Sequence, residues 1–208
     1  MGKRNQSLKI RQMVLLAILT AVILVLQLTG FAIKLPFLGT SVSLVLIPIT
    51  LGAMILGPAA GAFLGFVFGA EVFIVLGVMG MDTFTSYLFQ DNPAATAGIC
   101  LVKSTLAGYL SGLVFRLLSR KNRIAATFAA AAVTPVINTG VFVLGCLLIS
   151  NTLGGFMQAN GIDGTVVYFL LIGCAGINFL FELTLNLILA PVLGQLWHIA
   201  ARRFGSGA

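Results

Sequence analysis

Charged side chains are scarce in this sequence, which has only 12 Lys and Arg residues, five Asp and Glu residues and one His among 208. Charged residues make up 8% of the chain and hydrophobic residues 59%, whereas a soluble domain has roughly 25% charged residues. So few charges cannot cover a water-facing surface, and the mean hydropathy of +1.11 agrees. The composition therefore predicts an integral membrane protein without a separate soluble domain for nucleotide binding or catalysis.

Cysteine and histidine are too few, and too scattered, for most metal sites and many catalytic sites. Cys100, Cys146 and Cys174 lie in apolar stretches without C-x-x-C spacing, which predicts neither a disulfide framework nor a zinc site. His198 has no candidate serine nucleophile near it, and the ATP-binding motif G-x-x-x-x-G-K-[ST] is absent. We therefore expect no catalytic residue, no metal and no cofactor, and any uphill transport needs another subunit or an ion gradient.

The basic residues are concentrated at three chain positions separated by even numbers of apolar segments. Ten of the 12 lie before the first segment, around a break in the middle of the chain or after the last segment: Lys3, Arg4, Lys9, Arg11, Arg116, Arg120, Lys121, Arg123, Arg202 and Arg203. Cationic loops resist translocation and stay in the cytoplasm. We interpret the net charge of +7 as a topology signal that places both termini in the cytoplasm, and not as a nucleic-acid-binding surface.

Apolar segments of bilayer length set the predicted fold, because a spanning helix needs about 20 mainly apolar residues. A single transmembrane domain, residues 1–208, is expected to contain six spans at about 12–29, 44–56, 58–78, 94–118, 124–150 and 165–198. The predicted fold class is an all-α integral membrane protein with six transmembrane helices and cytoplasmic N- and C-termini. The polar segments 30–43, 79–93 and 151–164 are predicted to be outer loops.

Polar side chains inside spans are costly and therefore indicate function. Lys103, Asn138 and Asn178 are predicted to converge in a cavity that opens outward, with Glu182 four residues after Asn178 on the same helix face. A lysine ammonium there would bind a carboxylate or phosphate, and the amides would bind amide or hydroxyl groups. The structural alternatives are a buried ion pair between Lys103 and Glu182 and an interhelical hydrogen bond from Asn138.

Aromatic residues in the predicted outer loops are a second group of candidates. Phe37 and Tyr87 are expected either to form part of a lid over the ligand or to anchor the chain at the membrane interface. Glu71, toward the outer end of the third span, is expected to reach the interface by extending its side chain, and Asn186 is interpreted as structural.

Size, span number, basic N-terminal segment and cytoplasmic ends together resemble the S component, the substrate-binding subunit, of an energy-coupling factor (ECF) transporter. Ala17-Ile18-Leu19-Thr20-Ala21 resembles the family's A-x-x-x-A motif, in which small residues four apart let a partner helix approach closely. The letters LIPI at 46–49, followed by LGPAAG at 56–61, are similar to the family's junction between the second and third helices.

The resemblance implies a non-enzymatic transport subunit in the plasma membrane of a prokaryote. Its partners would be membrane lipid, a small water-soluble vitamin, a transmembrane coupling subunit and two ATPases, which would hydrolyse the ATP. Ala17 and Ala21 would form the docking surface on the coupling subunit. A glycine face on the third span would extend this surface: Gly57, Gly61, Gly65 and Gly69.

The polar residues of the spans are compatible with more than one vitamin. Pantothenate is the first candidate, because it combines a carboxylate for Lys103 with an amide and hydroxyls for Asn138 and Asn178. Riboflavin is the alternative within the same family. A non-transporting membrane assembly or scaffold protein is the alternative of another class, because it would explain the glycine-rich packing faces without a ligand.

Overall fold

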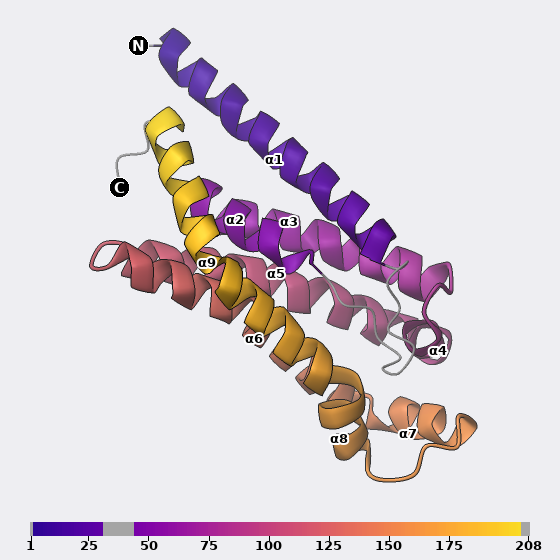
Figure 1. Ribbon diagram of the computed structural model, residues 1–208. Coiled ribbons are helices and arrows are strands. Elements are labelled where there is room, and N and C mark those ends of the chain that lie inside the picture. Colours follow the sequence, from indigo (N-terminus) through magenta and orange to yellow (C-terminus); the bar gives the residue numbers. More distant parts are fainter. Residues whose placement is uncertain (1, 31–43, 205–208) are drawn as a thin grey trace.

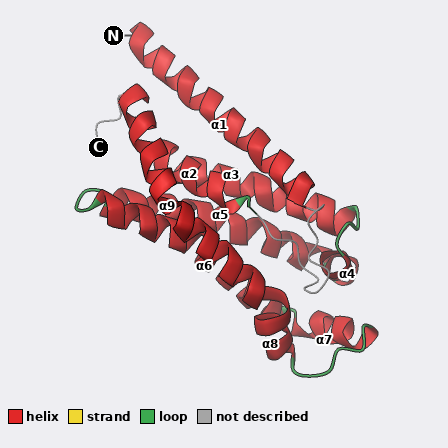
Figure 2. Cartoon of the chain, in the orientation of Figure 1, coloured by secondary structure: helices red, strands yellow, loops and turns green. Residues whose placement is uncertain are grey.

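The computed structural model describes residues 2–30 and 44–204, and all regular secondary structure in these ranges is helical (Figure 2). The helices, in chain order, are α1 (Gly2–Gly30), α2 (Leu46–Leu56), α3 (Pro58–Glu71), the π-helical segment η1 (Val72–Val78), α4 (Thr83–Asp91), α5 (Pro93–Leu118), α6 (Arg123–Leu148), α7 (Ser150–Ala159), α8 (Val166–Tyr168), the π-helical segment η2 (Phe169–Gly176) and α9 (Ile177–Phe204). Phe37 lies outside the described residues.

Five of the helical stretches are long and apolar enough to cross a membrane. These stretches are Leu8–Thr29, Pro58–Val78, Pro93–Leu118, Arg123–Leu148 and Val166–Arg202. The sixth apolar helix, α2, has 11 residues, about 16 Å of helix, which is shorter than the hydrocarbon core of roughly 30 Å. It packs against α1, α3, α5, α6 and α9. The prediction of an all-α membrane protein is confirmed.

Glycine and polar caps define where the helices begin. Gly57, with a φ of 95°, lies between α2 and α3, and its positive φ is a conformation that residues with a side chain rarely adopt. Pro58 then occupies the first turn of α3, where its missing N–H is not needed. At the starts of α5 and α6, Asn92 and Asn122 accept hydrogen bonds from backbone N–H groups three residues later, each at 3.1 Å.

Two of the segments predicted to be outer loops contain helices, and the loop prediction was wrong there. The Asp82 carboxylate accepts a hydrogen bond from the backbone N–H of Thr85 at 2.8 Å and so caps α4. In α7, Leu153, Phe156 and Met157 are buried at helical spacing, so one face of this short helix packs against the protein. The polar composition of both segments hid this amphipathic pattern.

The glycine face of the third span packs inside the protein against α5. Gly61, Gly65 and Gly69 lie one turn apart on α3. A Cβ atom at these positions would overlap backbone carbonyl oxygens of the facing helix, at Gly108, Ser104 and Cys100 respectively. The expectation that this face helps dock a partner was therefore wrong, because the same small residues that allow a partner helix to approach already hold α3 against α5.

The two ends of the molecule differ in composition. Both termini and the turn between α5 and α6 lie at one end, and α4 and α7 lie at the other (Figure 1). Arg116, Arg120, Lys121 and Arg123 flank that turn, so most of the basic residues collect at the end with the termini. This arrangement fits the cytoplasmic placement that we expect for that end from the distribution of positive charge.

Candidate functional site

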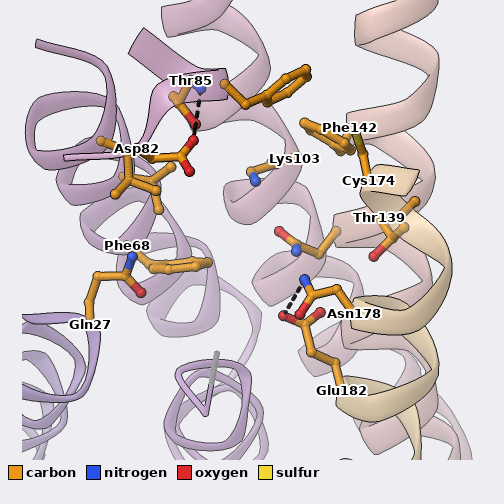
Figure 3. Close-up of a pocket in the computed structure, with 15 residues that line it drawn as sticks. Gln27, Phe68, Asp82, Thr85, Lys103, Thr139, Phe142, Cys174, Asn178 and Glu182 are labelled. Atoms are coloured by element: carbon orange, nitrogen blue, oxygen red, sulfur yellow. Dashed lines mark hydrogen bonds between the residues drawn. The ribbon is translucent and has the colours of Figure 1, made fainter. Parts of the chain in front are cut away.

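A polar cavity of about 120 Å³ lies among the helices (Figure 3). Side chains from α1, α3, η1, α4, α5, α6, η2 and α9 and from the cap of α4 line it: Gln27, Phe68, Val72, Leu76, Asp82, Phe84, Thr85, Lys103, Asn138, Thr139, Phe142, Cys174, Ala175, Asn178 and Glu182. Two π-helical segments, η1 and η2, contribute side chains to the cavity lining, and such segments often occur at functional sites. Lys103, Asn138, Asn178 and Glu182, all predicted to bind substrate, lie together there.

One wall of the cavity is formed by α5 and α6. The Nζ atom of Lys103 lies 5.0 Å from the centroid of the Phe142 ring, a distance at which a cation is attracted to the ring face. Asn138 is buried, and its Oδ1 accepts a hydrogen bond of 3.3 Å from Ser104 Oγ. Asn138 thus forms an interhelical hydrogen bond and also lines the cavity, and its role in substrate binding stays a prediction.

A second part of the wall is formed by α9, which packs against α6. Asn178 Nδ2 donates a hydrogen bond to Glu182 Oε1 at 3.4 Å, and Glu182 is only 2% exposed. Asn186, one turn further along, donates from Nδ2 to the backbone oxygen of Glu182 at 2.9 Å. Glu182 Oε2 has no hydrogen-bond partner in the described part of the chain, so Lys103 does not pair with it through that oxygen.

Asp82 adds a second carboxylate to the cavity. Its Oδ2 accepts from the backbone N–H and the hydroxyl of Thr85, at 2.8 Å and 2.7 Å. The carboxylate that caps α4 therefore also lines the cavity. Sequence reasoning missed it because the segment was taken to be a loop, where an aspartate carries no special signal.

Of the two aromatic candidates, Tyr87 lies in the described residues, and Phe84 on the same helix is placed differently from it. Tyr87 does not line the cavity, because α4 directs it against Phe156 of α7 with the ring centroids 5.3 Å apart. Phe84, from the same helix, does line the cavity and also contacts Phe156, at 5.2 Å between centroids. Near the cavity, α4 and α7 are thus joined by aromatic contacts, and a hydrogen bond from the Thr152 hydroxyl to Asp91 also joins them.

Two further residues of the spans differ from expectation. Glu71 is 7% exposed and does not extend to the interface, because it shares the inward face of the third span with Phe68 and Val75. Gln27, missed by sequence reasoning, is 5% exposed and brings α1 into the cavity wall. The sequence feature that could have identified Gln27 is an amide within an otherwise apolar span, because burying an amide in a membrane is costly unless the amide has a role.

The proposed docking residues lie away from the cavity. Ala17 and Ala21 are exposed on α1, whereas Leu19, Ile23 and Gln27 are buried at four-residue spacing on another face. One helix therefore contributes an amide to the cavity and presents two small residues on the outside of the protein.

An all-α, multi-pass membrane protein whose described helices surround a polar cavity has the architecture of a membrane-embedded binding protein. The sequence model of the family described as "ECF transporter, substrate-specific component" matches residues 11–194. No curated protein and no solved structure matches the chain. The family match covers most of the sequence, and the chain belongs to the substrate-specific components of ECF transporters. Membership makes it a transport subunit that associates with an ECF transmembrane subunit and ATPases and has a small-molecule substrate.

Proposed function

We propose that this protein binds pantothenate in the cavity and delivers it for import across the plasma membrane of a prokaryote. The observation that carries the proposal is that Lys103 lines a polar, partly open cavity and makes no hydrogen bond to Glu182 Oε2 in the described part of the chain. A cation in that position attracts a ligand carboxylate, and charge-assisted hydrogen bonds of this kind are strong. The amides of Asn138 and Asn178 then bind the amide and hydroxyl groups of the same ligand.

Ligand binding and partner docking are assigned to different parts of the protein. The cavity binds the vitamin, while the exposed face of α1 carrying Ala17 and Ala21 docks on the coupling subunit. Two ATPases supply the energy, and the substrate leaves toward the cytoplasm, the side where the arginine-rich end of the protein is expected to lie.

Replacing Lys103 with methionine is expected to weaken pantothenate binding about 10- to 100-fold, because hydrogen bonds to charged groups contribute roughly 1.5–3 kcal/mol. Methionine keeps most of the length of the side chain and removes the ammonium that lies over the Phe142 ring. Isothermal titration of the purified variant measures the loss. The matched control is a pantothenate analogue with an amide in place of the carboxylate, whose affinity the substitution should change by less than about twofold. If the substitution weakened the binding of both ligands equally, Lys103 would not be the residue that recognises the carboxylate.

Ligand-dependent thermal stabilisation separates this function from its alternatives. A ligand that binds the native state at 100 times its Kd stabilises it by about 2.7 kcal/mol. Pantothenate is expected to raise the unfolding temperature of the detergent-solubilised protein, and riboflavin is expected not to. Stabilisation by riboflavin alone would replace the proposed substrate with the other vitamin, and no stabilisation by either would favour a scaffold role.

A further inference from the structure

Hydrogen bonds within the cavity wall fix which atom each amide presents to a ligand. Asn138 uses its Oδ1 to accept from Ser104, so its Nδ2 donor remains available. Asn178 uses its Nδ2 to donate to Glu182 Oε1, so its Oδ1 acceptor remains available. The wall formed by α5 and α6 therefore offers donors, from Lys103 and Asn138, and the wall formed by α9 offers acceptors.

The acceptors on α9 have no partners of their own. Asn178 Oδ1 and Glu182 Oε2 are both buried atoms without a hydrogen bond in the described part of the chain. Most buried polar atoms in folded proteins are paired, and leaving an acceptor unpaired is costly. Both residues line the cavity, one helical turn apart, and Figure 3 shows them side by side on α9. A ligand with a hydrogen-bond donor would satisfy both atoms.

We propose that Asn178 Oδ1 and Glu182 Oε2 form an acceptor pair that binds an O–H or N–H donor of the ligand, in the same cavity as the Lys103 and Asn138 donors that bind its carboxylate. This inference rests on the proposed function and narrows the substrate class to carboxylates that also carry an O–H or N–H donor. A simple carboxylate without such a donor leaves the pair unsatisfied and is rejected. Sites built to bind a substrate hydroxyl discriminate strongly against analogues that lack it, for the same reason.

Ser104 is the positioning residue in this arrangement. The Ser104 hydroxyl is fully buried and donates to Asn138 Oδ1. This bond fixes the orientation of the amide and leaves its Nδ2 group available to a ligand. The turn of α5 that carries Ser104 is itself held against the backbone of α3 at Gly65. The availability of the Asn138 donor on this wall therefore depends on the close contact between α3 and α5.

The test compares pantothenate with its dideoxy analogue, in which both hydroxyls are replaced by hydrogen, on the wild-type protein and on Glu182→Met. The wild type is expected to bind pantothenate at least about tenfold more tightly than the analogue, which corresponds to one lost hydrogen bond at a buried acceptor. In Glu182→Met this ratio is expected to fall to about two or less, because one of the two acceptors is gone. A ratio unchanged in Glu182→Met would overturn the acceptor pair, even if the variant binds both ligands more weakly.

Glu71→Met is the matched control, because Glu71 is also buried in a span and has an oxygen without a hydrogen bond but does not line the cavity. It should keep the wild-type ratio, and a ratio that collapsed there too would overturn the assignment to Glu182.

If the wild type binds no pantothenate, the proposed substrate fails, and the small molecules that co-purify with the protein test the acceptor pair separately. A retained molecule that has O–H or N–H donors, and is lost from Glu182→Met but not from Glu71→Met, supports the pair. A retained molecule without such a donor overturns it.

Discussion

Tryptophan at Ala17 or Ala21 is expected to abolish vitamin uptake in cells while ligand affinity of the purified protein stays within about twofold of the wild type, as for substitutions at distant sites. Both alanines are exposed on α1 and neither lines the cavity. A helix can approach closely only where side chains are small, so a large ring at either position separates the two helices at the docking surface. Uptake of radiolabelled vitamin and isothermal titration measure the two effects.

Ile18→Trp is the control for this prediction. Ile18 is 53% exposed on the same helix but already has a large side chain, and it lies off the line that joins the two alanines. The control should retain uptake. Wild-type uptake by the alanine variants would show that α1 does not dock through this face, and a parallel loss of binding would show that the face belongs to the ligand site.

Valine at Gly65 is expected to destabilise the protein by about 3 kcal/mol and to weaken ligand binding as well, because overpacking a tight contact typically costs about 1–3 kcal/mol. The added Cβ would overlap the carbonyl oxygen of Ser104, a backbone atom that cannot move without the helix. Separation of α3 from α5 displaces Ser104 and also the adjacent residue Lys103, which lines the cavity. Thermal unfolding in detergent measures the stability, and titration below the transition measures binding.

Gly98→Ala, also within a helix, tests whether the effect comes from this contact. A Cβ at Gly98 meets nothing within 4 Å, so alanine there should leave stability unchanged or raise it slightly by restricting the unfolded chain. If Gly65→Val behaved like Gly98→Ala, the close contact between α3 and α5 would be contradicted.

The sequence was sufficient to predict the membrane fold, because hydropathy and the distribution of positive charge act along the chain. The helix starts at Asn92 and Asn122 follow from local caps, and Gly57-Pro58 marks a turn by its backbone preferences alone. These signals depend on neighbours in sequence and need no knowledge of tertiary packing.

Features that depend on packing between helices could not be predicted in the same way. Four-residue spacing of Gly61, Gly65 and Gly69 predicts a close helix contact, but it does not say whether the partner is another protein or α5. Tyr87 and Phe84 are three residues apart on α4, and only Phe84 reaches the cavity. Gln27 lies far from the other cavity residues in sequence, and only the packing of α1 against the bundle brings it there.

Within the candidate site, the residue types were predictable and their hydrogen-bond directions were not. A lysine, two asparagines and a glutamate inside spans indicate a polar site by their cost alone. The bonds from Ser104 to Asn138 and from Asn178 to Glu182 then decide which atoms remain for a ligand. That decision depends on rotamers and on side chains from neighbouring helices.

Mass spectrometry of small molecules that co-purify with the wild-type protein and with Lys103→Met tests the central claim most directly. We expect a small carboxylate to be retained by the wild type at about one molecule per chain and to be absent from Lys103→Met, since a tightly bound ligand survives purification and this one depends on the ammonium. A retained ligand without a carboxylate, or a carboxylate retained equally by both proteins, would contradict it.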